Sequence, residues 1–303
     1  MGTRRIFENA VAALFAATAG LASAAPSPAV NRVDLEAAVA APWDDAAFDT
    51  LLAGLPQVNF DDNGTQRRFY VWEGDLLLDR ENVRASLYAA KQKATPARNS
   101  SELLVQVRDD DLPGHWPRPD RALTYAVDCT GLAADQCTAL TSAMTAATAD
   151  WVKACARCGL SFRRVEAPPG SKPGEIATGG APAGPASPRF IVRYQPDEWG
   201  YVALAFFAND PTYKRYLSVT PGYFITSFDR TGVLRHEIGH VLGYRHEHNR
   251  AASGCLFEDS KWRPLTAYDP KSVMHYFCGG GGTKLMQLTA TDIAGHQQLY
   301  KSP

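Results

Sequence analysis

The residues from His236 to His246 restrict the fold of this chain more than any other stretch. His236 and His240 lie four positions apart, so on a helix they stand on the same face, one turn above the other. His246 would point elsewhere if the helix continued. Gly243 removes this difficulty, because a glycine can adopt positive φ, end the helix and turn the chain back. The sequence therefore predicts a helix, a glycine turn and three imidazoles directed at one point.

Three neutral imidazoles are typical of a tetrahedral zinc site whose fourth position is open to water, the arrangement of catalytic zinc. Glu237 follows the first histidine, and there its carboxylate can act on that water as a general base. We therefore predict one zinc ion (Zn2+), held by His236, His240 and His246. The alternative is two surface histidines and a buried glutamate. The three histidines, the glutamate and the glycine that define the motif would arise together by chance at fewer than roughly one start position in a million.

The composition is that of an ordinary globular protein. The chain has 303 residues, of which 45% are hydrophobic, enough for one large domain or two modest ones. Lys and Arg total 31 and Asp and Glu total 32, so the net charge is close to zero. Since nothing in this balance favours a polyanion, we expect no nucleic-acid partner and no anionic membrane partner.

Residues 1–24 have the features of a signal peptide. Arg4 and Arg5 make a basic start, and residues 10–21 form a short apolar run. Residues 22–24 are small, as is typical just before a signal-peptidase cleavage site. The apolar run is too short to span a bilayer, so we expect no stable membrane anchor. The protein is therefore predicted to be secreted or periplasmic.

Export changes the interpretation of the cysteines, because oxidising compartments favour disulfides. The even set predicts three disulfides among Cys129, Cys137, Cys155, Cys158, Cys255 and Cys278. Cys255 and Cys278 bracket the stretch after the zinc histidines and are predicted to pair. The other four allow three pairings. Cys155 and Cys158 alternatively make a redox pair or half of a zinc knuckle, although no second half exists.

A polar, proline-dotted stretch over residues 94–119 divides the chain and is the best candidate for a domain boundary and a processing site. Ahead of it we expect two helices within residues 33–55, a strand, glycine turn and apolar run over 68–78, and a helix over 79–93 capped by Asp79. Beyond it the patterning predicts several further elements. They are strands at 123–127, 160–165, 190–194, 202–207 and 216–219, a long amphipathic helix at 133–156, a surface loop at 166–188, and a helix at 289–300 with Thr289 and Asp292 as a capping pair.

The zinc motif, together with Ser272-Val273-Met274-His275-Tyr276, resembles the astacin family within the metzincin clan of zinc metallopeptidases. Metzincins place a methionine turn beneath the metal, and this run matches the Ser-x-Met-His-Tyr form of astacins in full. Glu247 and Arg250 also fit the family's His-Glu-x-x-Arg. The acidic residues that usually follow are replaced by Ala251 and Ala252, which implies a divergent bacterial-type member.

The resemblance implies an α+β fold. Residues 116–303 would be the metzincin, zincin-like catalytic domain, with a twisted mixed sheet, two long helices, a zinc cleft and a smaller irregular C-terminal lobe. Residues 25–115 would be a prosegment. The function implied is an exported zinc endopeptidase that hydrolyses peptide bonds of a protein or peptide substrate with a zinc-activated water and Glu237 as general base. An extended substrate is expected to add to a strand edge within residues 202–219.

The resemblance also assigns roles around the metal. Met274 would lie beneath it as a floor, and Glu237 would return its proton to the leaving amine. Tyr276 would be a fifth zinc ligand that leaves the metal and donates a hydrogen bond to the transition state; the alternative is a core tyrosine near the site. His275 and His248 are expected near the site but not as ligands.

Asp75 is a further candidate zinc ligand. Trp72-Glu73-Gly74-Asp75-Leu76 resembles the short astacin prosegment motif in which an aspartate caps the metal and keeps a zymogen inactive. A carboxylate is a good zinc ligand, and Gly74 lets the backbone approach closely. The alternative is an ordinary turn acid, since Gly-Asp is common in turns.

Two other functions remain open. A matrixin-like metzincin peptidase would keep the three histidines without using Tyr276 as a ligand. A non-catalytic exported protein would keep zinc for structure alone, but such a site has no use for Glu237 as a base. His115 and His296 belong to no motif.

Overall fold

The computed structural model describes most of the chain. The described residues are 37–72, 74–92, 103–108, 112–174, 187–196, 201–250, 255 and 261–301. The predicted signal peptide and the first part of the predicted prosegment lie outside these ranges, as does most of the loop expected at 166–188. Within the described ranges, no helix combines the length and apolarity needed to cross a bilayer.

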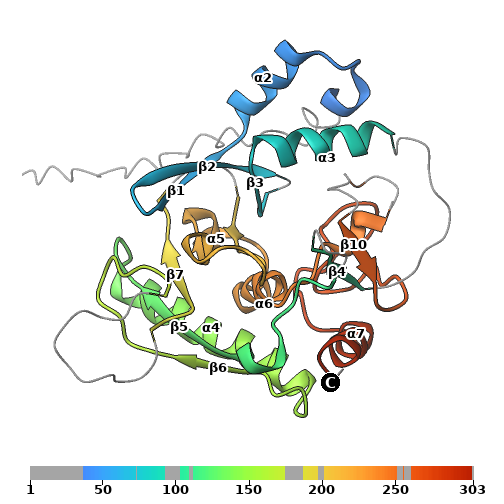
Figure 1. Cartoon of the computed structure of the whole chain (residues 1–303). Helices are drawn as coiled ribbons and strands as arrows, with labels where there is room; N and C mark the ends of the chain where they lie inside the picture. Colours follow the sequence, from blue (N-terminus) through green and yellow to red (C-terminus); the bar gives the residue numbers. More distant parts are fainter. Residues whose placement is uncertain are drawn as a thin grey trace, which may run out of the picture.

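A twisted mixed sheet of five strands forms one wall of the molecule, in the order β6-β5-β7-β9-β8 (Figure 1). The strands are β5 (Ala122–Asp128), β6 (Ser161–Arg164), β7 (Phe190–Tyr194), β8 (Ala203–Leu204) and β9 (Tyr216–Val219). β5, β6, β7 and β9 run parallel, and β8 is antiparallel at one edge. The strand predicted at 202–207 is shorter, because only Ala203 and Leu204 pair with β9, while Ala205 and Phe206, next along the chain, are buried in the main core.

Two long helices pack against each other beneath this sheet. α4 (Ala134–Ala154) buries Leu140, Met144 and Trp151 at helical spacing, and the Trp151 indole N–H donates to the Arg235 carbonyl at 2.8 Å. α6 (Arg230–Val241) occupies the centre of the molecule (Figure 1). The predicted α+β fold with two long helices is confirmed.

The C-terminal part contains few regular elements. It holds η3 (Glu247–Arg250), β10 (Trp262–Pro264) and α7 (Ala290–Lys301). The predicted capping pair at α7 is confirmed, because the Thr289 amide donates to Asp292 Oδ2 at 2.9 Å and the Asp292 amide donates to Thr289 Oγ1 at 3.1 Å. The remaining short elements, η1 (Arg118–Asp120), η2 (Thr212–Lys214) and α5 (Pro221–Ile225), connect the strands and helices of the upper part.

β4 (Leu104–Gln106) lies ahead of the predicted domain boundary and yet belongs to the main body. It pairs antiparallel with β10, and Val105 forms a bridge with Tyr244. Leu103 and Val105 are buried in the same core as α4 and α6. The boundary at residue 116 stays a prediction, but residues 103–107 share their packing with the zinc helix.

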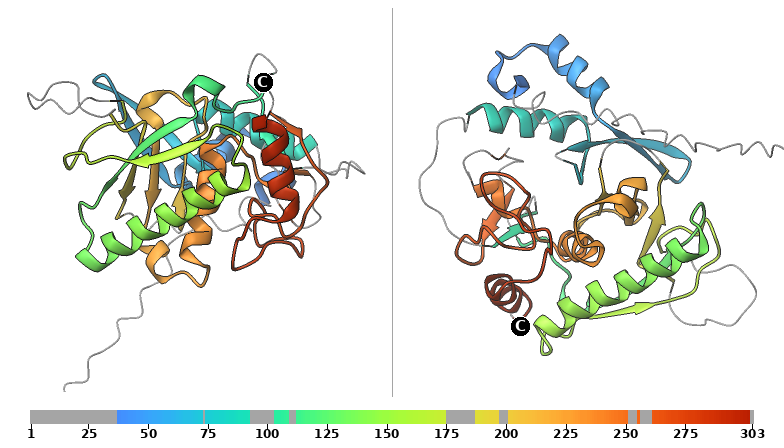
Figure 2. Two further views of the ribbon diagram at one scale, coloured as in Figure 1. Left: turned by 90° about the horizontal axis from the view of Figure 1, so that it is seen from below. Right: turned by 180° about the vertical axis from the view of Figure 1, so that it is seen from behind.

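Residues 37–92, here called the N-terminal segment, fold over α6 on the side away from α4 (Figures 1 and 2). The segment contains α2 (Asp45–Gly54), β1 (Gln57–Asp62), β2 (Thr65–Trp72), β3 (Leu76–Leu78) and α3 (Arg80–Gln92). Its three strands form an antiparallel sheet. The predicted Asp79 cap is confirmed, since its Oδ1 accepts from the Asn82 amide at 2.8 Å.

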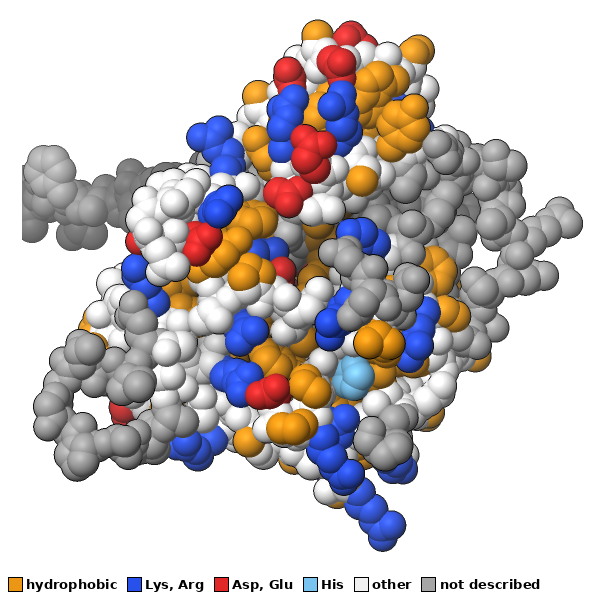
Figure 3. Space-filling model, viewed as in Figure 1, with side chains coloured by type: hydrophobic (Ala, Val, Ile, Leu, Met, Phe, Trp, Pro, Cys, Tyr) orange, Lys and Arg blue, Asp and Glu red, His pale blue; other side chains and the backbone are white. Residues whose placement is uncertain are grey.

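The N-terminal segment makes apolar contacts with the main body and carries charged side chains on its outer surface. Val58, Phe69 and Leu77 share a hydrophobic cluster with Tyr201 and Leu204 from the β8 edge of the sheet. On the outer surface, basic and acidic side chains lie side by side on the segment (Figure 3). Such exposed ion pairs add little stability, so the shared cluster does more to fix the segment on the body.

Three disulfides are present, as predicted. Cys255 pairs with Cys278, which confirms the pair expected around the stretch after the zinc motif. The pairings left open are Cys129–Cys137 and Cys155–Cys158. Cys155 and Cys158 are buried at the end of α4, so this pair ties the helix end to the chain that follows.

Candidate metal centre

The end of α6 shows why glycine is needed at position 243. Gly243 has φ of +100°, and a Cβ added there would lie 2.2 Å from the Gly114 carbonyl oxygen. The Gly243 amide donates to the His240 carbonyl at 2.8 Å, and the Tyr244 amide donates to the Gly239 carbonyl at 2.9 Å. The helix therefore closes and the chain turns back, which brings His246 beside the two helical histidines.

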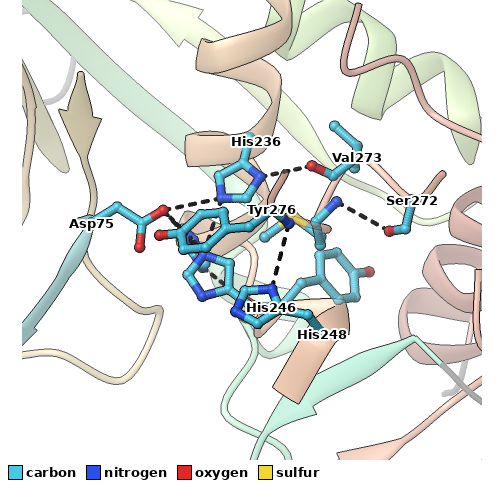
Figure 4. Close-up of polar contacts among 10 residues, drawn as sticks. Asp75, His236, His246, His248, Ser272, Val273 and Tyr276 are labelled. Atoms are coloured by element: carbon cyan, nitrogen blue, oxygen red, sulfur yellow. Dashed lines mark hydrogen bonds and ion pairs between the residues drawn. The ribbon is translucent and has the colours of Figure 1, made fainter. Parts of the chain in front are cut away.

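The three imidazoles meet at one buried point, together with the Asp75 carboxylate (Figure 4). His246 Nε2 lies 3.2 Å from His236 Nε2 and 3.1 Å from His240 Nε2. Asp75 Oδ2 lies 3.0 Å from His246 Nε2, 3.2 Å from His236 Nε2 and 3.6 Å from His240 Nε2. Four of the five sequence-predicted ligands are thus brought together, including Asp75 from the N-terminal segment, whereas the role of Tyr276 as a fifth ligand stays a prediction.

The hydrogen bonds of the Nδ1 atoms of His236 and His240 show that the Nε2 atom of each ring faces the point where the imidazoles meet. His236 Nδ1 donates to the Val273 carbonyl at 2.7 Å, and His240 Nδ1 donates to the Tyr244 carbonyl at 2.8 Å. A carbonyl oxygen only accepts, so each Nδ1 carries a proton and each neutral ring turns an Nε2 lone pair inward. Burial lowers the pKa of His240 to about 4, which keeps that ring neutral.

These donors fit a zinc ion. Burial raises the pKa of Asp75, but the polar interactions with the neighbouring imidazoles, above all His246, outweigh burial and hold this pKa well below its ordinary value. A carboxylate and inward lone pairs at such short distances repel one another unless a cation lies between them. Three imidazoles and a carboxylate are an ordinary zinc donor set.

Glu237 lies beside the donors without joining them. Its side chain is buried, and within the described residues its Oε2 has no hydrogen-bond partner. Burial, and then the negative charge of Asp75, raise the pKa of Glu237 well above its ordinary value. A carboxyl group with a raised pKa next to a metal site can take up a proton and release it again, as the predicted role requires.

The methionine turn lies directly beneath α6. A Cβ added at Gly239 would lie 2.3 Å from Met274 Sδ, so the methionine fills the space that this glycine leaves. Asp292 holds the turn, because its Oδ1 accepts from Ser272 Oγ at 2.6 Å and its Oδ2 accepts from the Val273 amide at 2.9 Å. The sequence predicts Asp292 as a helix cap but not this second role, which depends on contacts with residues 19 and 20 positions away.

Tyr276 lies against the imidazoles. Its ring centroid is 4.1 Å from that of His246 and 5.8 Å from that of His236. The His248 ring stacks on both, with its centroid 4.7 Å from that of Tyr276 and 5.0 Å from that of His246. His275 turns away, with its Nε2 bonded to the Tyr268 hydroxyl at 2.8 Å.

The remaining histidines lie outside the site. His296 Nδ1 is hydrogen-bonded to the Tyr244 hydroxyl at 2.7 Å, and His115 meets the Tyr300 ring edge-on. Ligand atoms of His248, His275 and Cys278 also lie close together, but the cysteine is already bonded to Cys255. That second group is therefore no metal site.

A cleft of about 350 Å³ opens between the sheet edge and the methionine turn. His236, Glu237 and Tyr276 border it on one side, and Val202 and Ala203 at the start of β8 border it on the other. Gly74 and Asp75 of the N-terminal segment also line it. The space next to the donors is thus shared between the edge strand and this segment.

Comparisons with known proteins give low overall similarity. No family model matches the chain, and no curated protein is similar to it. The chain resembles astacin-like zinc metallopeptidases in its motifs. Similar solved structures include two of myroilysin, at 17% and 16% identity, with TM-scores of 0.44 and 0.38, covering 66% and 62% of this chain and 99% and 86% of theirs.

A third similar structure is high choriolytic enzyme 1, a hatching enzyme zinc-protease from the medaka fish Oryzias latipes. It has 14% identity and a TM-score of 0.34, and the match covers 60% of this chain and 90% of that one. All of these identities and TM-scores are low.

Proposed function

We propose that the chain is an exported zinc metalloendopeptidase that folds in a latent form. The observation that carries this proposal is the convergence of His236, His240, His246 and Asp75 on one buried point, with the Glu237 carboxyl beside it. A structural zinc site needs four donors but no base. The buried Glu237 oxygen, which has no hydrogen-bond partner among the described residues, would only cost free energy there, which favours a catalytic function over zinc binding alone.

The reaction proposed is hydrolysis of a peptide bond. A zinc ion held by the three histidines would lower the pKa of a water in its open position to about 7 and polarise the scissile carbonyl. Glu237 takes the proton of the attacking water and passes it to the leaving amine. The Tyr276 hydroxyl, which borders the same cleft, donates a hydrogen bond to the oxyanion as it develops. The substrate backbone adds to the β8 edge strand.

The N-terminal segment is proposed to belong to an inhibitory prosegment of residues 25–115, with Asp75 as the blocking residue. Its Oδ2 lies within 3.6 Å of all three Nε2 atoms, where the fourth zinc donor belongs. A carboxylate in that position leaves no room for water. Gly74, with φ of +104°, lets the chain enter the cleft at this point.

Export is the remaining part of the proposal. Residues 1–24 support it, and so do the three disulfides, because disulfides of this kind persist in oxidising compartments. N-terminal sequencing of the secreted latent form should show a chain that begins after residue 24.

Glu237→Gln tests the catalytic proposal. Asp75→Ala chains with and without the Glu237→Gln substitution are compared by zinc analysis and by cleavage of a fluorogenic peptide. The amide keeps the size of the side chain and is no ligand, so zinc should remain while turnover falls by about 10²- to 10⁴-fold. Glu166→Gln, on an exposed side chain, is the matched control. Full activity of Glu237→Gln would overturn the mechanism.

Asp75→Ala tests the latency. With the N-terminal segment still attached, the variant should hydrolyse peptides faster than the unaltered chain, because the fourth position becomes open. Asp49→Ala, an exposed acid of the same segment, should change nothing. Equal activity of the Asp75→Ala and unaltered chains would refute the blocking role.

Tyr276→Phe separates the astacin-like mechanism from the matrixin-like one. The ring packs on His246, so the phenylalanine should preserve the packing and the zinc content. A large loss of turnover would support the hydroxyl as the oxyanion donor, whereas unchanged turnover would favour the matrixin-like mechanism.

A further inference from the structure

We propose that the cleft selects a substrate with a large apolar side chain next to the scissile bond, and that Met286 sets this preference. The inference rests on the peptidase function proposed above and adds the class of side chain that the site accepts. The cavity of about 350 Å³ begins at His236 and Glu237 and continues away from the metal donors. A side chain that flanks a bond cleaved at these residues enters this space.

Apolar side chains form the far part of the cavity. Val233 lies four residues before Glu237 on α6, so both side chains stand on the same face of the helix and border the cavity. Phe228 precedes the helix, and its ring meets that of Phe277 edge-on with centroids 6.0 Å apart. Met286, from the stretch before α7, completes this apolar wall.

The backbone of Met286 shows that its position is maintained against a cost. Its φ is +43°, a left-handed conformation that side-chain-bearing residues seldom adopt. The Met286 amide donates to Thr283 Oγ1 at 3.1 Å, and its carbonyl accepts from Arg235 Nη1 at 2.6 Å. Arg235 is itself anchored to Asp150 at 2.6 Å. A Cβ at Gly232 would lie 2.9 Å from Met286 Cβ, so the helix leaves room for this residue.

The charges around the cavity agree with an apolar occupant. No Lys or Arg is among the described residues that line it, and its carboxylates, Asp75 and Glu237, lie at the metal-binding end. An acidic substrate side chain would lose its water and find no Lys or Arg among the described lining residues to pair with it. A basic one would be drawn to the carboxylate that the reaction needs. A large apolar side chain gains free energy simply by leaving water.

The test uses the Asp75→Ala chain, because Asp75 lines the same cavity. Peptides that differ only in the residue next to the scissile bond carry Leu, Phe, Ala, Asp or Lys there. We expect kcat/KM for Leu or Phe to exceed that for Asp or Lys by about 10- to 100-fold. Met286→Lys should shift the preference toward Asp by at least about 10-fold at unchanged zinc content. Leu285→Lys, at a neighbouring residue that is 59% exposed, should leave the order unchanged.

Binding of the same peptides to the Asp75→Ala, Glu237→Gln chain adds a readout that needs no turnover. The apolar preference would be supported if the Leu and Phe peptides bound more tightly than the Asp and Lys peptides and if Met286→Lys removed this difference. Equal binding and cleavage of all peptides, or an order that Met286→Lys does not change, would overturn the specificity while the peptidase function stands. Selective binding without cleavage by any Glu237-containing chain would instead overturn the peptidase function.

Discussion

Gly243→Ala should damage both the stability of the fold and the metal centre. With φ of +100°, an alanine would be strained by about 2 kcal/mol. Its Cβ would lie 2.2 Å from the Gly114 carbonyl oxygen, and relief requires a backbone shift that costs roughly another 2 kcal/mol. The sum of about 4 kcal/mol is a large share of the 5–15 kcal/mol typical of a folded protein. Because His246 follows three residues later, zinc affinity should fall as well.

Gly170→Ala is the matched control for this substitution. Gly170 also has positive φ, +76°, but a Cβ there would meet nothing within 4 Å. It should therefore lose only the strain, about half of the expected total. Urea unfolding of the full chain measures both free energies, and competition with a zinc indicator measures affinity. If the two variants lost equal stability and kept equal zinc affinity, the packing of Gly243 on Gly114 would not be what holds this turn.

Three further predictions concern contacts around the site. His296→Gln should reduce the dependence of the unfolding free energy on pH. Burial lowers the folded-state pKa of His296 to about 4, so the folded protein holds this ring neutral. The unaltered chain should therefore lose roughly 3 kcal/mol of unfolding free energy as pH falls from 6.5 to 4, and the variant should lose less. Gln106→Ala removes the oxygen that accepts from Arg245 Nη1 at 2.6 Å, so zinc competition should show several-fold weaker affinity, and Gln106→Glu should restore it. Replacing Cys255 and Cys278 together by serine should lower the unfolding free energy by about 3 kcal/mol in urea titrations, whereas an unchanged midpoint would contradict a stabilising crosslink.

The zinc motif could be predicted closely because its geometry is local. Helical spacing brings His236 over His240, and Gly243 needs no distant residue to be recognised as a turn. The caps at Asp79 and Thr289 were predictable for the same reason, since each bonds within three residues along the chain. Local chemistry determines such features whatever the rest of the fold is.

What the sequence did not reveal depends on distant partners. β4 lies in a polar, proline-dotted stretch, and it becomes a strand because it pairs with residues 262–264. The second role of Asp292 exists only because α7 packs beside the methionine turn. Likewise, three pairings of the first four cysteines were compatible with the sequence, and only their proximity in the fold selects Cys129 with Cys137. Tertiary context, not propensity, decides these features.

The three histidines are close in sequence, but the contacts that hold their turn are not. The Trp116 indole donates to the Val241 carbonyl across 125 residues, and the Leu103 amide donates to Thr266 Oγ1 across 163. Long closures of this kind cost chain entropy before they return any free energy, so they form late in folding. A nascent or partly unfolded chain therefore has its zinc motif without a rigid site. The three imidazoles then converge only at the end of folding, so a stable metal site marks a chain that has already closed its longest contacts.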